Sequence, residues 1–184
     1  MTPAQNAIIK ADISANADMN TILNNSDGSF EIARLYNLPA SPTFNVWQTN
    51  TQAKDIFDTI DWTKYTPTDS PEATGMYTAR SMAIQTKQMN LQNMTMGRDT
   101  LDISKSNIRA GLRDAVIQIP SGVGGALVSA AGASASLLLA ACIRPATRLE
   151  KLLSTGPATT GTTTANLLGF EGTVSYQEIE AARA

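Results

Sequence analysis

With 184 residues and a mass of 19.5 kDa, the chain is long enough for one domain with a buried core. Charged residues make up only 16% of the chain and are scattered, so the surface must be largely neutral and polar, which favours burial against a partner. The net charge of −2 and the pI near 5.1 disfavour direct DNA binding. The chain has no histidine and one cysteine, which excludes an intramolecular disulfide, a cysteine-based zinc site and the usual general base.

The first 25 residues have the apolar spacing of one or two short amphipathic helices. Thr2 is suited to the N-cap and Pro3 to the first helical turn. No apolar core flanked by positive charge is present here, so we expect no signal peptide and synthesis in a host cytoplasm.

Residues 26–50 alternate between helical and extended signals. The dipeptide Asp27-Gly28 predicts a turn, and residues 30–37 predict a helix. Pro39 and Pro42 then favour extended backbone. The alternating stretch "FNVWQTN" after them predicts an extended segment or a short strand that carries aromatic side chains.

Helical spacing returns in residues 51–65, with Thr51 as the expected cap. The longest predicted helix runs from about Pro71 to Met96, with Ser70 as its cap and Gly97 at its end. It carries apolar residues seven positions apart, and we expect this stripe to pack in the core, although a methionine-rich peptide groove is an alternative. The stripe consists of Met82, Met89 and Met96 together with Ile84 and Leu91.

A further helix is predicted, with Ser106 or Asn107 as its cap and Pro120 as the residue that stops it. Its inner face should consist of Ile108, Leu112, Ala115 and Val116. Arg109 and Arg113 share another face, one turn apart.

The uncharged tract at 117–143 has three interpretations. As a membrane span it is short, rich in Ala, Gly and Ser, and without an aromatic belt. As a phosphate-binding loop, "GVGGALVS" lacks the required lysine. We therefore predict a glycine-rich hinge followed by a close-packed soluble helix from about Ala126 to Ile143, in which Cys142 is a buried small hydrophobe and not a reactive thiol.

The C-terminal part begins with a helix predicted from Pro145 to about Ser154 and ended by Gly156. The low-complexity stretch at 156–170 is expected to be free or to be ordered by a partner. The last helix should be capped by Ser175, with Glu178 completing a capping box.

Catalytic and metal sites are not supported by the sequence. Asp55, Asp58 and Asp61 stand three residues apart, but no calcium loop accompanies them, so a solvated helix face is the preferred interpretation. The same holds for the pair Asp99 and Asp102. We expect no catalytic residue, no bound metal and no cofactor, and hence a protein that is not an enzyme.

The chain nevertheless resembles a known family. The segments "YNLPASPTFNVWQTN", "IDWTKY", "MNLQNMTMGRDTLDISKSNIRAGLRDAV", "CIRPATRLEKLL" and "FEGTVSYQEIEAARA" occur in this order. A helical body followed by "NIRAGL", "RPATRLEKL" and a short last helix is similar to the head-to-tail adaptor, or connector, proteins of tailed bacteriophages. The likeness covers about three quarters of the chain, and its motifs are packing motifs.

The resemblance implies a virion structural protein of the neck region that docks below the portal protein as a ring of identical subunits, commonly a dodecamer, and links the capsid to the tail. Its partners would be other copies of itself, the portal protein and the tail or stopper (nozzle) proteins. DNA would pass through the ring without sequence-specific binding, and no membrane would be involved. The alternatives are a capsid decoration or tail-fibre attachment protein, and a small membrane protein such as a lysis factor.

The expected fold is therefore mainly α: a helical bundle in a single domain, 1–184, with extended Gly/Thr-rich arms, flexible near 120–130 and 156–170, and at most a short strand or hairpin. The arms and an exposed aromatic segment are the predicted contact regions, although core packing is an equal alternative for Trp47. The predicted interface residues are Phe44, Val46, Trp47, Gly122, Val123, Gly124, Gly125, Pro157, Thr160, Thr162 and Leu167.

Overall fold

A computed structural model describes residues 1–65, 76–120, 127–128 and 135–184. The chain divides into two compact units, each built from separate stretches of sequence. Unit 1 consists of Met1–Val46, Pro145–Pro157 and Ala165–Ala184. Unit 2 consists of Trp47–Arg144 and Ala158–Thr164.

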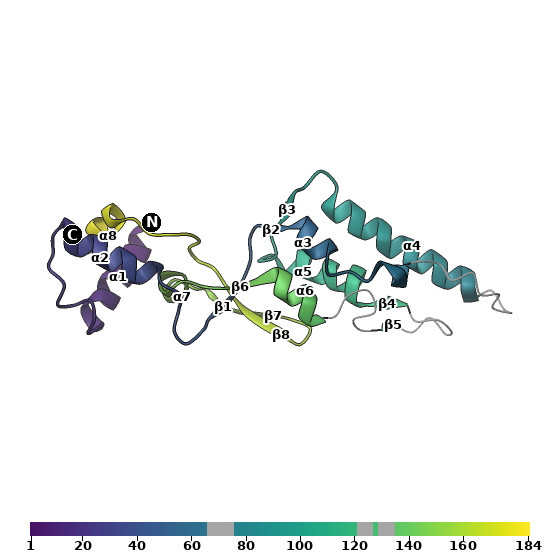
Figure 1. Cartoon of the computed structure of the whole chain (residues 1–184), viewed down its shortest axis with the longest axis horizontal. Coiled ribbons are helices and arrows are strands. Elements are labelled where there is room, and N and C mark those ends of the chain that lie inside the picture. Colours follow the sequence, from purple (N-terminus) through teal and green to yellow (C-terminus); the bar gives the residue numbers. More distant parts are fainter. Residues whose placement is uncertain (66–75, 121–126, 129–134) are drawn as a thin grey trace. The chain divides into compact units, whose positions relative to one another are not determined.

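The fold is a mixture of helices and strands, so the prediction of a mainly helical bundle is wrong. A four-stranded mixed sheet has the strand order β6-β1-β8-β7, and two small sheets pair β2 with β3 and β4 with β5 (Figure 1). In the larger sheet β1 runs parallel to β8, with Val46 opposite Asn166. The strands are β1 (Asn45–Trp47), β2 (Thr51–Gln52), β3 (Thr100–Leu101), β4 (Ile119–Pro120), β5 (Leu127–Val128), β6 (Ile143–Pro145), β7 (Gly156–Thr160) and β8 (Thr163–Leu167).

The hairpin formed by β7 and β8 is the main reason why the fold contains more strand than the predicted helical bundle. The low complexity of residues 156–170 predicted an arm that is free or ordered by a partner, but threonine is β-branched and fits strands well. Gly161 stands at the tip with a φ of +63°, the left-handed conformation that two-residue hairpin loops require. The segment is therefore ordered within the single chain.

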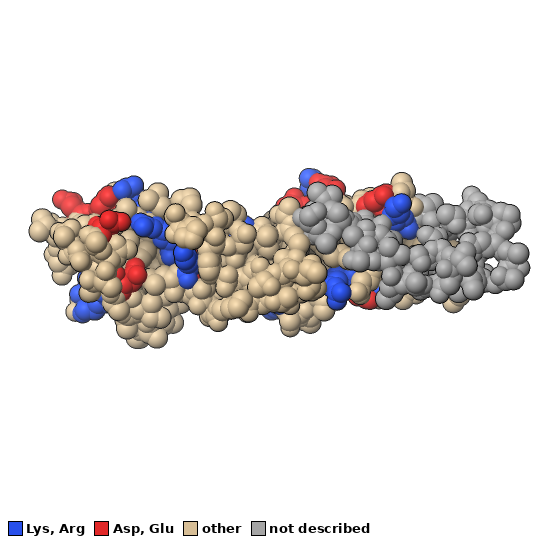
Figure 2. Space-filling view, turned by 90° about the horizontal axis from the view of Figure 1, so that it is seen from below, with Lys and Arg blue, Asp and Glu red and all other residues tan. Residues whose placement is uncertain are grey.

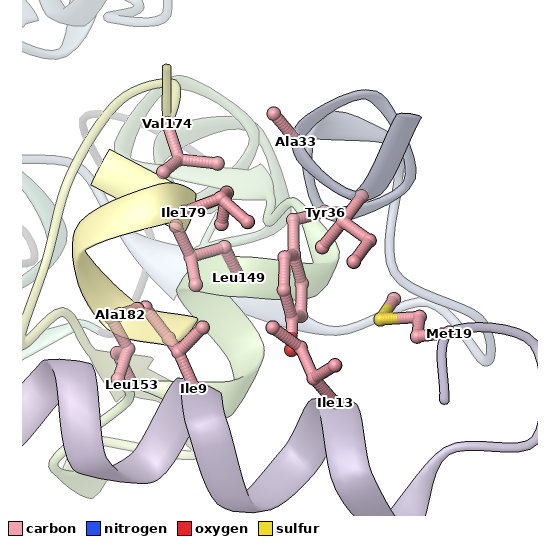
Figure 3. Close-up of a cluster of buried hydrophobic side chains, with 11 residues drawn as sticks. Ile9, Ile13, Met19, Ala33, Tyr36, Leu149, Leu153, Val174, Ile179 and Ala182 are labelled. Carbon is pink, nitrogen blue, oxygen red and sulfur yellow. The ribbon is translucent and has the colours of Figure 1, made fainter. Parts of the chain in front are cut away.

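Unit 1 is a small helical core. Its helices are α1 (Pro3–Ala15), α2 (Ser26–Asn37), α7 (Arg148–Leu152) and α8 (Tyr176–Arg183). The last helix packs against both α1 and α2. Buried apolar side chains from all four helices meet between them (Figure 3), and the core residues include Ile9, Ile13, Met19, Ile32, Tyr36, Leu149, Leu153 and Ile179.

Polar contacts fix the core of unit 1 at two points. The Tyr36 hydroxyl donates to the Asp12 carboxylate at 2.7 Å. The Asn37 amide exchanges two hydrogen bonds of 2.9 Å with the backbone of Val174, as a strand residue would. Burial and the neighbouring Asp12 raise the pKa of Tyr36 well above its usual value, so this phenol stays protonated.

The helix starts of unit 1 match the predictions for the first and last helices and differ from them for the two helices between. Thr2 caps α1 and Ser175 forms a capping box with Glu178 in α8, as predicted, and Thr2 also forms a capping box with Gln5. The predicted turn at residues 27–28 is wrong, because Asn25 caps α2 and the helix already includes them. The predicted helix start at Pro145 is also wrong, since this residue ends β6 and Thr147 caps α7.

Unit 2 contains the helices α3 (Ala53–Phe57), α4 (Met76–Thr95), α5 (Ser106–Leu112) and α6 (Ala135–Cys142), the 3-10 helix η1 (Trp62–Tyr65) and the π-helix η2 (Arg113–Ile117). The helix α4 packs against α5 and η2. The buried Tyr65 hydroxyl donates to the carbonyl of Ala115 at 2.7 Å. Two predicted caps are wrong: Thr51 lies in β2, and α5 starts at Ser106 without a side-chain cap.

The apolar stripe of α4 does not form one face. Ile84 and Leu91 are buried, as expected, whereas Met82, Met89 and Met96 are 60 to 72% exposed. Ile84 follows Met82 by two positions, which is about 200° around a helix, so the two sets lie on opposite faces. The prediction that the methionines pack in the core is therefore wrong. Gly97 ends the helix with a φ of +68°, as predicted.

The uncharged tract divides into separate elements. The prediction of one helix from Ala126 to Ile143 is wrong, because Leu127 and Val128 pair with Pro120 and Ile119 and the described helix α6 starts at Ala135. Cys142 is buried at the end of α6, as predicted. Among the described residues no helix is long and apolar enough to cross a membrane.

Two adjacent isoleucines of α1 test the core of unit 1. Ile9 is fully buried and Ile8 is 44% exposed. We expect Ile9→Ala to lower the free energy of unfolding by about 2 to 5 kcal/mol, because it leaves a cavity. Ile8→Ala should change it by less than about 0.5 kcal/mol. Urea unfolding followed by circular dichroism measures both, and equal effects would contradict this description of the core.

Candidate functional site

A cavity of about 310 Å³ lies within unit 2. Its walls come from β1, α5, η2, α6 and the tip of the β7–β8 hairpin, and they are mostly apolar. The lining residues are Trp47, Ile103, Arg109, Leu112, Arg113, Ile117, Leu138, Leu139, Cys142, Thr160, Gly161, Thr162 and Thr163.

Arg109 is the buried charge of this cavity, with only 6% of its surface exposed. Its Nε donates to the Thr160 hydroxyl at 2.8 Å. Its Nη1 donates to the carbonyls of Ile103 and Ser104 at 2.8 and 2.5 Å. One guanidinium group thus joins α5, the segment before it and the β7 strand.

The same guanidinium lies over the ring of Trp47, with its central carbon 4.9 Å from the ring centroid. This distance is within the range of cation–π attraction. The indole Nε1 donates to the carbonyl of Ala158 at 2.9 Å, which fixes the ring against β7. The aromatic face therefore supplies part of the electrostatic stabilisation that a buried cation needs.

None of the carboxylates that the structure describes contacts the guanidinium of Arg109 directly. Within the described ranges, no carboxylate lies at ion-pair distance from it, and its Nη2 has no hydrogen-bond acceptor. Burial lowers the pKa of Arg109, and Asp102 acts against this from farther away. Asp102 itself pairs with Lys105 at 3.4 Å. The guanidinium remains charged because its usual pKa is far above neutrality.

The π-helix shapes one side of the cavity. The turn changes from α to π at Arg113, and both Arg113 and Ile117 line the cavity. Such widened turns occur frequently at functional sites. A Cβ atom added to Gly161 would lie 3.3 Å from the Nε atom of Arg113, whose long exposed side chain can shift, so the positive φ is the main reason for glycine at the hairpin tip.

The interface residues predicted from the sequence differ in how far the fold buries them. Val46 and Trp47 are buried, so the prediction of exposed anchors is wrong for both, and the core alternative holds for Trp47. Phe44 is half-buried, with the Lys151 ammonium 5.8 Å from its ring centroid.

The remaining predicted residues lie on the hairpin or outside the described structure. Thr160 and Thr162 line the cavity together with Trp47, while Pro157 in β7 is exposed and Leu167 in β8 is half-buried. Gly122, Val123, Gly124 and Gly125 lie outside the described residues. Arg109 is not predicted as a site residue by the sequence, because its spacing from Arg113 indicates only a shared helix face.

The acidic residues considered as metal ligands are not gathered into a site. Asp58 pairs with Lys54 at 2.9 Å, and Asp61 accepts a hydrogen bond from the hydroxyl of Thr63. Across the described part of the chain, no group of three or more potential metal ligands is found.

Exposed apolar side chains form a second kind of candidate site. We name Met82 and Met89 on α4, together with Met96 directly after it, the methionine row. Next to Met96 lies an open hollow of about 720 Å³, lined by Phe57, Trp62, Gln88, Leu91, Gln92 and Thr95. In unit 1, Phe30 is 63% exposed beside a hollow of about 470 Å³ whose lining includes Leu38 and Tyr176.

Comparisons of the chain with protein-family models, with curated proteins and with solved structures give no match. The cavity around Arg109 and the exposed apolar side chains are therefore the features from which a function can be inferred.

The thiol of Cys142 tests whether the cavity is closed to solvent. Burial raises its pKa to about 12, so less thiolate exists near pH 8.5 than in an exposed cysteine. We expect iodoacetamide to modify the folded protein at least tenfold more slowly than the same protein in urea. The pKa of Cys142 is higher in the folded chain than the ordinary value of 9.0, which we take for the unfolded chain, so the unfolded chain loses this proton first. The contribution of the protonated thiol to the free energy of unfolding is therefore full below pH 9 and is lost as the pH rises towards 12. Equal alkylation rates would contradict the buried position.

Proposed function

We propose that this chain is a virion structural protein of a tailed bacteriophage, a head-to-tail adaptor that docks under the portal as a ring. The observation that carries the proposal is the exposed apolar surface on each unit: the methionine row in unit 2 and Phe30 with its neighbours in unit 1. The resemblance of the sequence to connector proteins gives this surface its biological context.

A ring of identical subunits needs two different contact surfaces on every subunit, because each copy meets its two neighbours head to tail. The methionine row lies in unit 2, and the exposed residues Phe30, Leu38 and Tyr176, which we name the Phe30 surface, lie in unit 1. These two surfaces can meet this requirement. Methionine is flexible and polarisable, and it suits a contact that must adapt during assembly. We assign the methionine row to the contact with the next copy in the ring.

The surface chemistry supports burial against partners. Figure 2 shows that Lys, Arg, Asp and Glu cover little of the visible described surface. Neutral polar groups cost less to remove from water than unpaired charges do. In this proposal the partners are further copies of the chain, the portal protein and the tail or stopper proteins, in the neck of the virion.

A single charge placed in the methionine row tests this function. Met89→Glu should reduce co-sedimentation with purified portal rings at least tenfold, because docking as a ring needs the contact between neighbouring copies, and that contact would now bury an unpaired carboxylate. Ala110→Glu adds the same charge at an exposed position of another helix, α5, outside the methionine row, and should leave co-sedimentation unchanged. Both variants should fold, since glutamate is a good helix former.

The same mixture distinguishes the proposed role from its alternatives. The unmodified chain should be monomeric or weakly associated alone and should join a high-mass complex when portal rings are added. No co-sedimentation at micromolar concentration would contradict the adaptor role. Binding to capsid shells in place of portal rings would identify a decoration protein, and recovery in membranes that resist a carbonate wash would identify a membrane protein.

A further inference from the structure

We propose that the cavity around Arg109 binds a carboxylate carried on a short apolar group. This inference is independent of the adaptor role, because it rests on the interior of unit 2 and not on its exposed surface. The ligand class follows from three features of the cavity: one buried cation, a free donor on that cation and apolar walls.

The first feature is the charge. A buried guanidinium is normally paired with an anion, because removing a charge from water is costly. Arg109 instead has three neutral oxygens and the face of Trp47 around it, and the described residues place no carboxylate in contact with it. A bound anion would complete the neutralisation that these groups begin.

The second feature is the free donor. The Nε and Nη1 atoms of Arg109 already donate to protein oxygens, while Nη2 has no acceptor among the described residues. Arg113 and the hydroxyl of Thr162 also line the cavity and add donors. A carboxylate has two acceptor oxygens and matches this small set of donors.

The third feature is the remaining wall. Leu112, Leu138 and Ile103 are buried and line the cavity together with the thiol of Cys142. A volume of about 310 Å³ is at the lower end of the usual range for ligand pockets. The rest of the ligand must therefore be small and apolar. Inorganic phosphate is disfavoured, because it would leave these walls without contacts.

Two sources can supply this chemistry: a free aliphatic monocarboxylate, or the C-terminal carboxylate of a peptide that ends in leucine. Octanoate represents the first source, and the acetylated tripeptide Gly-Leu-Leu with a free C-terminus represents the second. Octanol and the peptide amide are the matched probes without the negative charge. Preference for one carboxylate over the other identifies the source, and either result supports the proposal.

Trp47 provides the signal. The chain has two tryptophans, and Trp62 lies in η1 and does not line this cavity, so Trp62→Phe leaves Trp47 as the only indole. In this background we expect octanoate to change the fluorescence of Trp47 in a saturable way. Octanol and inorganic phosphate should bind at least tenfold more weakly, or not at all.

Variants of arginine separate charge recognition from general apolar binding. Arg109→Gln should weaken octanoate binding at least tenfold, while Arg98→Gln, which removes an exposed arginine away from the cavity, should leave it unchanged. If Arg109→Gln does not fold, protection of Cys142 against iodoacetamide by octanoate, but not by octanol, is the second measurement. The proposal is overturned if octanoate gives neither a saturable signal nor protection at millimolar concentration, or if octanol acts equally well.

Discussion

The buried guanidinium of Arg109 is the interaction on which the organisation of unit 2 depends. It joins the backbone before α5, the hydroxyl of Thr160 and the ring of Trp47, which come from distant parts of the sequence. The planar group can do this because its donors point in fixed directions while its face stacks on an aromatic ring. A lysine would supply the charge without this geometry. The cavity forms beside the guanidinium because these contacts hold its walls in place.

Unit 1 is stabilised differently. Its helices bury a continuous apolar core, and their ends are closed by side-chain caps at Thr2, Thr147 and Ser175. Both units leave large apolar side chains exposed, which is costly for an isolated chain and useful for a subunit that is covered after assembly. The proposed adaptor role accounts for the exposed apolar side chains, because they do not stabilise the free chain but would be buried between neighbouring subunits of a ring.

Local sequence signals predicted much of unit 1 and less of unit 2. Caps such as Thr2 and Ser175 act within one helical turn, so their motifs were sufficient. The strands β7 and β8 were missed because low complexity was given more weight than the β-branched side chains of threonine. The methionine row was misplaced because spacing by seven defines a stripe but not which stripe faces the core. Arg109 could not be recognised as a site residue, since its partners lie up to 62 positions away and only the fold brings them together.

The copy number of the chain in purified virions tests the central claim most directly. A ring subunit below the portal has a fixed stoichiometry, whereas a decoration protein follows the many subunits of the capsid. Quantitative mass spectrometry of virions, with isotope-labelled peptides of this chain and of the portal protein, measures the ratio. The account predicts a ratio close to one, with the chain retained in tail-bearing particles. A ratio that matches the capsid protein, or absence from the particle, would contradict it.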